Sequence, residues 1–234
     1  MTDVHGKCLM RTEDLIKCSP KLYHMAEDGS WPNIQRYGLL STSAILTLYG
    51  YCGTEREKFE SEWRPQKTII SCDGLEDAII RDQIPMPPDV LKRCLLGGMS
   101  PKEWYGLING RIFFWATWKS LEIFLAAKEY KNSPQLVITV DARLLLERYA
   151  SRVTLSSINS GSTYYDPEKY DRPHTRGRET FKKISDYNAP YIAELVIEEG
   201  ITNIAEVATS VKRWIAHRIN YEKPEFEKLA HIWP

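Results

Sequence analysis

Two ionisable residues in apolar stretches could carry acid–base chemistry. His24 ends a short apolar run, and Glu194 is the single acid within residues 191–197. Because side chains alternate along a strand, Glu194 shares a face with Ile192 and Val196. Such a carboxylate either points into a cleft or lies on the exposed side of an edge strand. In a cleft, an apolar wall would raise its pKa and suit it to act as a general base near neutral pH.

A third feature is the aromatic run IFFWA at residues 112–116, followed by Ser120 and by a helix that ends at Tyr130. Taken alone, this pattern is typical of a core strand and a core helix, and a lone histidine such as His24 is typically a hydrogen-bonded structural residue. The sequence contains no GxxxxGK[ST], GxGxxG, HExxH, GxSxG or kinase motif. Function must therefore be inferred from the combination of the three features.

The elements that would position these residues can be predicted from apolar periodicity and capping residues. Ser100, Pro101 and Glu103 form a helix-start pattern, so a helix is expected over residues 101–108. The long polar segment 156–190 is typical of a functional or mobile loop. Further strands are expected over 22–25, 68–70, 78–80, 112–115, 136–140, 153–155 and 192–197, and further helices over 12–18, 31–37, 41–49, 53–66, 90–96, 119–130 and 143–149. Strands and helices mix without a regular alternation, which indicates a single α+β domain around a mixed sheet.

Composition and charge narrow the class of protein. The 234 residues are 43% hydrophobic and 26% charged, which excludes wholesale disorder, collagen and coiled coil. Lys and Arg total 31, as do Asp and Glu, so any nucleic-acid contact must be local. Five cysteines without a CxxC motif indicate neither a disulfide framework nor a zinc site, and no metal is expected. With no apolar leader and no membrane-length apolar run, we expect a cytoplasmic protein without membrane contact.

Three segments together resemble the motifs of the ADP-ribosyltransferase fold, and they are most similar to DarT-type transferases, which modify bases in DNA. The segments are LYHMAEDGSWPNIQRYGLL, GRIFFWATWKSLEIFLAAKEY and YIAELVIEEGITNI, and the resemblance spans about residues 21–204. It implies one domain over residues 1–234 with a split mixed or antiparallel β-sheet flanked by helices. The core would occupy residues 21–204, followed by a C-terminal helix over 205–218.

The resemblance implies NAD as co-substrate and assigns residues to bind it. His24 would hydrogen-bond a ribose hydroxyl, and the backbone around Met25 or Gly38 would lie near the nicotinamide. An aromatic side chain of the second motif would stack on the nicotinamide ring. That position is Phe113 or Phe114 here, where the family pattern has tyrosine, so stacking is retained without a phenol. Tyr130, which ends the same motif, is also assigned to the NAD site.

The resemblance further implies two catalytic residues. Glu194 would orient the nicotinamide ribose and deprotonate the acceptor, and Arg81 would face the pyrophosphate or the reacting centre, for which a planar cation is well suited. Cleavage of NAD expels neutral nicotinamide and leaves an oxocarbenium-like sugar. Because the leaving group needs no proton, one carboxylate can suffice to stabilise the developing positive charge.

In this fold the loop before the catalytic strand contacts the acceptor, and residues 159–190 take that place. Residues 169–183 contain six basic and two acidic side chains, with tyrosines at 164, 165 and 170. Cations for phosphates and rings for bases suit a short stretch of single-stranded DNA or other nucleic acid. A solvated loop and a surface for an acidic protein are the alternatives. The expected substrate-loop residues are Asn159, His174, Arg176 and Arg178.

The combined prediction is an NAD-dependent mono-ADP-ribosyltransferase that modifies a nucleic-acid base, acting as a bacterial toxin or defence effector that an antitoxin could restrain. One alternative is an NAD glycohydrolase, in which water is the acceptor. Another is a catalytically inactive module that binds a nucleotide or a partner on the same scaffold. Both catalytic hypotheses, the transferase and the glycohydrolase, require His24 and Glu194 to line one crevice beside an aromatic wall, although they are far apart in the sequence.

Overall fold

The centre of the molecule is an eight-stranded sheet. A computed structural model of the chain describes residues 10–165, 173–217 and 223–234. The strand order is β12-β11-β6-β1-β5-β9-β7-β8, and every neighbouring pair is antiparallel. The strands are β1 (Lys21–Glu27), β5 (Arg111–Trp115), β6 (Gln135–Asp141), β7 (Val153–Ser156), β8 (Lys182–Lys183), β9 (Glu194–Glu198), β11 (Ala208–His217) and β12 (Glu225–Trp233). The expected α+β domain with an antiparallel sheet is confirmed.

The sheet divides into two halves between β1 and β5. These two strands share a single residue pair, Tyr23 with Trp115. By contrast, β1 pairs with β6 along its whole length, and β5 pairs with β9 along its whole length. The halves therefore separate immediately after Tyr23, and His24 is the first residue beyond the junction. This is the split that the sequence predicted.

Helices cover both faces of the sheet. The helices α1 (Thr12–Cys18), α2 (Trp31–Tyr37) and α8 (Ala142–Tyr149) contribute Leu15, Trp31 and Leu145 to the main core. Helix α7 (Trp118–Leu125) packs on the opposite face against Met25 and Val137. No helix within the described ranges is long and apolar enough to cross a membrane.

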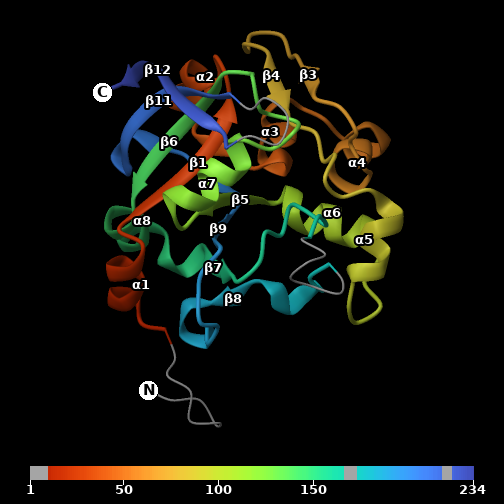
Figure 1. Cartoon of the computed structure of the whole chain (residues 1–234). Coiled ribbons are helices and arrows are strands. Elements are labelled where there is room, and N and C mark those ends of the chain that lie inside the picture. The colour runs from red at the N-terminus through yellow and green to blue at the C-terminus, as the bar shows by residue number, and fades with distance from the viewer. Residues whose placement is uncertain (1–9, 166–172, 218–222) are drawn as a thin grey trace.

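The remaining elements gather at one side of the sheet, where they flank the split (Figure 1). They are the helices α3 (Thr42–Leu48), α4 (Gly53–Ser61), α5 (Pro88–Cys94) and α6 (Pro101–Asn109) and the hairpin of β3 (Thr68–Ile70) and β4 (Ala78–Ile80). The expected helix start is confirmed, because the Ser100 hydroxyl accepts from the Glu103 amide and the Glu103 carboxylate accepts from the Ser100 amide. A short pairing of β2 (Leu39–Leu40) with β10 (Gly200–Ile201) completes this region.

Three expected helices differ from the structure. The helix expected over 53–66 ends at Ser61. The helix expected over 119–130 ends at Leu125, so Tyr130 lies in the turns beyond α7. The C-terminal helix expected over 205–218 is wrong, because residues 208–217 form β11. Apolar residues at Val207, Val211 and Ile215 are four apart, a spacing that fits one face of a helix and also one face of a strand, so it does not distinguish the two. Pairing with β6 and β12 makes this segment a strand.

Candidate active site

A cavity of about 890 Å³ opens at the split in the sheet. It is lined by His24 of β1, Phe113 of β5 and Glu194 of β9, together with Arg81 and Tyr130 from the segments after β4 and α7. The imidazole and the carboxylate that the sequence singled out therefore line one cavity beside an aromatic ring. The spatial convergence that the prediction required is present.

His24 is held as a neutral hydrogen-bond acceptor. Its Nδ1 lies 2.9 Å from the carbonyl oxygen of Phe113, and a carbonyl can only accept, so Nδ1 carries the proton. Burial lowers the pKa of His24 to about 4, so the ring is neutral at pH 7. In that tautomer Nε2 has a free lone pair. The group that His24 recognises in the cavity must therefore be a donor, such as a hydroxyl.

Glu194 is a buried carboxylate on an interior strand, which excludes the edge-strand alternative. Its side chain is 3% exposed, and β9 lies between β5 and β7. The Ser160 amide is 3.2 Å from both carboxylate oxygens, and the Ser160 hydroxyl donates to Oε2 at 2.7 Å. Burial raises the pKa of Glu194 to about 7, against the lowering effects of Ser160 and Arg176. The expected rise in pKa is confirmed in direction, and the group can gain or lose a proton near neutral pH.

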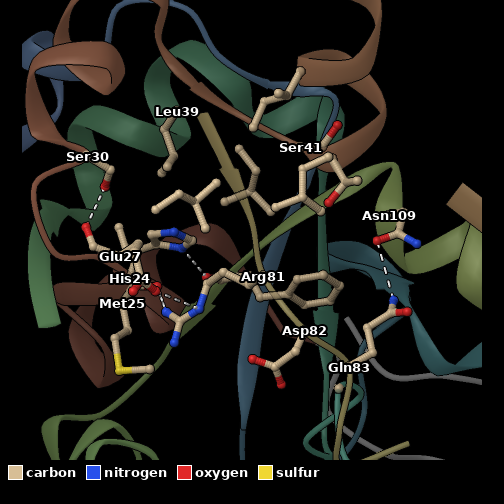
Figure 2. A pocket seen from close by; sticks show the side chains of 18 of the residues that line it. His24, Met25, Glu27, Ser30, Leu39, Ser41, Arg81, Asp82, Gln83 and Asn109 are labelled. Carbon is tan, nitrogen blue, oxygen red and sulfur yellow. Dashed lines mark hydrogen bonds and ion pairs between the residues drawn. The ribbon is translucent and has the colours of Figure 1, made fainter. Parts of the chain in front are cut away.

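Arg81 brings a planar cation to the opposite side of the cavity. Its Nη1 donates to the Met25 carbonyl at 3.1 Å, and its guanidinium carbon lies 4.5 Å from the centre of the Tyr130 ring. Figure 2 shows the guanidinium beside His24 and Glu27. The nearest approach to Glu27 is 3.9 Å, and Nη2 is buried without a hydrogen-bond partner. Arg81 is thus positioned by stacking and one hydrogen bond, with one donor unused.

Of the two candidate stacking residues, only Phe113 lines the cavity. Phe114 is fully buried in the main core and contacts the His24 ring from behind, at 5.7 Å between ring centres. The assignment of Phe114 to the NAD site is therefore wrong, because alternation along β5 sends it to the other face. The phenol missing at Phe113 is present nearby in Tyr130, whose pKa burial raises to about 12.

Met25 and Gly38 both line the cavity, and each also has a structural role. The Met25 carbonyl is already bonded to Arg81. Gly38 has φ +96°, and a Cβ there would lie 2.6 Å from the Ile201 carbonyl oxygen and 2.7 Å from the Thr202 Cα. Only glycine permits this approach of the chain, which places β2 against β10.

The expected substrate-loop residues are divided by the structure. Asn159 lines the cavity, as do Gly161, Ser162 and Tyr164 from the same turn. Lys169, Tyr170 and Arg172 lie outside the described residues. His174, Arg176 and Arg178 do not line the cavity, which contradicts their placement at the substrate.

The reasons for Arg176 and Arg178 differ. Arg176 is 2% exposed and donates to the carbonyls of Ser160, Ser162 and His174. Arg178 is exposed but pairs with Glu103 at 3.2 Å on another side of the loop. The sequence showed a cluster of charge, but it could not show that one member of the cluster is buried.

Sequence reasoning missed Ser160, which supplies all the hydrogen bonds to Glu194 described above. It lies in the polar run INSGS, where no spacing distinguishes it from its neighbours. A buried polar group on the cavity wall was also missed: Arg64 Nη2 donates to Asn109 Oδ1 at 2.9 Å, and Gln83 Nε2 is 3.4 Å from the same oxygen (Figure 2). These contacts connect residues from three different segments, so no local pattern predicts them.

Unpartnered polar atoms are concentrated around the cavity. In the described part of the chain, ten buried side-chain nitrogen or oxygen atoms have no hydrogen-bond partner, and six belong to residues that line this cavity. The six are Glu27 Oε2, Asn33 Oδ1, Tyr37 Oη, Arg81 Nη2, Gln83 Oε1 and Arg111 Nε. Each such atom costs about 1–3 kcal/mol. A polar ligand that bonded some of them would recover part of that cost.

Among the side chains that the structure describes, no group of three or more His, Cys, Asp or Glu could hold a metal ion. The site offers instead an acceptor at His24, a cation at Arg81, aromatic walls and a base at Glu194. This set suits an organic substrate with hydroxyls, a negative charge and a flat ring.

The chain was compared with known protein families, curated proteins and solved structures. A family described as "Family of unknown function (DUF7002)" matches residues 20–212, a range that includes every residue named as lining the site. No curated protein matches the chain. No solved structure matches it either.

Proposed function

We propose that this chain, which belongs to the DUF7002 family of unknown function, is an NAD-dependent mono-ADP-ribosyltransferase with a nucleic-acid base as acceptor. The observation that supports this most is the convergence of His24, Arg81, Phe113 and Glu194 on one cavity at the split in the sheet. The resemblance between the sequence motifs and those of ADP-ribosyltransferases gives each of these side chains a role, and the geometry of each suits that role.

His24, Arg81 and Phe113 would bind the dinucleotide. The free lone pair on His24 Nε2 accepts from a ribose hydroxyl. The unused Nη2 donor of Arg81 matches a phosphate oxygen, which is the acceptor that guanidinium binds best. The Phe113 ring supplies a flat face for nicotinamide.

Glu194 would carry the chemical step. The bond between C1′ of the ribose and nicotinamide breaks, and neutral nicotinamide leaves with the electron pair. A lone pair on the acceptor base forms the new bond to C1′, and the acceptor proton passes to Glu194. The ionised carboxylate stabilises the positive charge that develops on the sugar. With its pKa near 7, Glu194 is ionised often enough to begin the reaction and basic enough to take the proton.

A nucleic-acid acceptor is supported by the turn on the cavity wall. Tyr164 lines the cavity with 63% of its surface exposed, and Tyr165 beside it is 40% exposed. Exposed rings at a cavity mouth can stack on unpaired bases. We place this activity in the cytoplasm, where NAD and nucleic acids meet, as that of a toxin or defence effector. Expression of the active chain would then arrest growth, whereas Glu194→Gln would not.

The test is incubation with NAD labelled in the adenylate half, with separate pools of single-stranded DNA, RNA and protein and with no acceptor. The expected result is label joined to DNA or RNA together with release of nicotinamide. Label on protein alone would contradict the base acceptor, and nicotinamide release without labelled product would favour the glycohydrolase. No release above the level of Glu194→Gln in any pool would contradict catalysis altogether. Glu147→Gln, at an exposed position on α8, is the matched control.

A further inference from the structure

Arg176 is a buried cation whose guanidinium donates to main-chain carbonyl oxygens. Nη1 donates to the Ser160 carbonyl at 3.0 Å, and Nη2 donates to the Ser162 carbonyl at 2.8 Å. Nε and Nη2 also lie 3.4 and 3.3 Å from the His174 carbonyl. Burial of a charge is costly unless it is fully bonded, so this arrangement fixes the positions of the carbonyls that satisfy it.

The base of the Arg176 side chain is itself fixed. The Arg176 amide donates to the Cys94 carbonyl at 2.9 Å, and its carbonyl accepts from the Leu96 amide at 2.9 Å. The guanidinium carbon lies 5.8 Å from the centre of the buried Trp104 ring. Arg176 therefore connects the end of α5 to the turn at residues 160–162, and it can hold that turn in one place.

That turn supplies the donors that hold Glu194. The Ser160 amide and hydroxyl both point at the carboxylate, and Ser160 is fully buried. Three residues further on, the amide and the hydroxyl of Thr163 donate to the Pro85 carbonyl at 2.9 and 2.7 Å. The turn is thus anchored from behind by Arg176 and from the side by Pro85, while its front faces the cavity.

We infer that Arg176 is a positioning residue for Glu194: by binding the carbonyls of Ser160 and Ser162, it fixes the turn whose Ser160 donors orient the carboxylate. Arg176 does not touch the substrate. The catalytic consequence rests on the proposed function, whereas the effect on the carboxylate itself does not.

The surroundings of Glu194 allow this contribution to be measured. Arg176 lies behind the turn, and His24 and Arg81 line the same cavity as Glu194. The neighbouring strands place Trp115 of β5 and Ser156 of β7 opposite it, and neither side chain is charged. The charge of Arg176 also acts on Glu194 directly, so the experiment must separate charge from positioning.

Arg176→Lys makes that separation, because lysine keeps the charge but cannot bind two carbonyls in a fixed fork. The titration of Glu194 is followed by carboxyl-carbon NMR on the full chain labelled at glutamate, with the signal assigned by its loss in Glu194→Gln. We expect Ser160→Ala and Arg176→Lys each to raise the midpoint by roughly one pH unit, because the ionised form loses donors. The double variant is expected to show less than the sum of the two shifts, since Arg176 acts through the Ser160 amide and hydroxyl and Ser160→Ala removes only the hydroxyl.

Two results would overturn the inference. One is a midpoint that Arg176→Lys leaves unchanged while Arg176→Met raises it, which would reduce Arg176 to a distant charge. The other is additive shifts in the double variant. Hydrogen exchange of the amides at residues 159–162 is measured on the same samples, and it should be faster in Arg176→Lys than in the exposed control Arg178→Lys.

Activity provides the second readout. Where NAD cleavage is observed, the acid limb of the pH–rate profile should move upward with the NMR midpoint, and kcat should fall while KM for NAD changes by less than about twofold. The expected NMR shifts without any NAD cleavage would contradict the proposed function and leave the positioning role intact.

Discussion

The two sides of the cavity differ in how completely their polar groups are hydrogen bonded. On the Glu194 side, both carboxylate oxygens accept from Ser160, and Arg176 satisfies the carbonyls behind it. On the Arg81 side, Arg81 Nη2 and Glu27 Oε2 have no hydrogen-bond partner, and the ion pair between Arg81 Nε and Glu27 Oε2 is long at 3.9 Å. The first side is preorganised before any substrate arrives, as a catalytic group must be. The second retains bonding capacity for a ligand, so loss of Glu194 should affect the reaction and loss of Arg81 should affect binding.

Glu194→Gln tests the catalytic side and should have the largest effect. Glutamine keeps an oxygen that can accept from Ser160, but it can neither take a proton nor stabilise positive charge as a carboxylate does. We expect kcat for nicotinamide release to fall about 1000-fold while the dissociation constant for NAD changes less than about threefold. Single-turnover release and calorimetric binding measure the two quantities. A large loss of affinity with kcat preserved would reverse the comparison.

The same variant should change the pH dependence of stability. The pKa of Glu194 is about 7 in the folded chain and 4.5 in the unfolded reference, so the folded state holds the proton more tightly. Wild-type stability should therefore fall as pH rises from about 4.5 to 7, and Glu194→Gln should lack this fall. The free energy of unfolding of the variant minus that of wild type should therefore be larger above pH 7 than at pH 4, by up to roughly 3 kcal/mol.

Denaturant unfolding at a series of pH values measures that difference, with Glu147→Gln as the exposed control. A difference between wild type and Glu194→Gln that stays constant from pH 4 to 8 would show that the carboxylate is not preorganised in a buried setting. The contrast between the two sides of the cavity would then lose its physical basis.

Arg81→Met tests the binding side. It removes one hydrogen bond to the Met25 carbonyl and the stacking on Tyr130, but it also removes a buried donor without a partner. We expect the dissociation constant for NAD to rise about 30-fold, as for loss of a charge-assisted contact, with the free energy of unfolding changed by less than about 1 kcal/mol. The exposed Arg93→Met is the control. Strong destabilisation without loss of NAD affinity would make Arg81 a structural cation.

The two sides also differ in how much of them the sequence predicted. His24 and Glu194 were found because each interrupts or ends an apolar run, and Arg81 and Phe113 were found through the motif resemblance; all four line the cavity. Phe114 was assigned to the cavity together with Phe113 because periodicity alone does not say which face of β5 is solvated. Short elements such as β3, β4 and α1 have the expected bounds, since their neighbours contain strong turn or capping residues.

What could not be predicted depends on contacts distant in the chain. The support of Glu194 joins residues 160, 176 and 194, and Arg176 was predicted to face phosphate because a sequence shows charge but not burial. The strand β11 was mistaken for a helix for a related reason. Its partner β6 lies about 70 positions earlier in the chain, and bulges conceal the alternation of its buried and exposed side chains. In each case the missing information is which distant segment covers the residue.

His24→Asn should have the smallest effect and tests the binding side at a neutral group. Asparagine can place an amide nitrogen where Nδ1 lies and so keep the donation to Phe113, but it has no acceptor at the position of Nε2. One neutral hydrogen bond to a ribose hydroxyl is worth about 1 kcal/mol, so KM for NAD should rise roughly fivefold with kcat nearly unchanged. His24→Gln, whose amide reaches further, should recover part of that loss. An equal rise in KM in both variants, together with lowered stability, would contradict a contact with the substrate. His24 would then serve to hold the split in the sheet through its bond to Phe113.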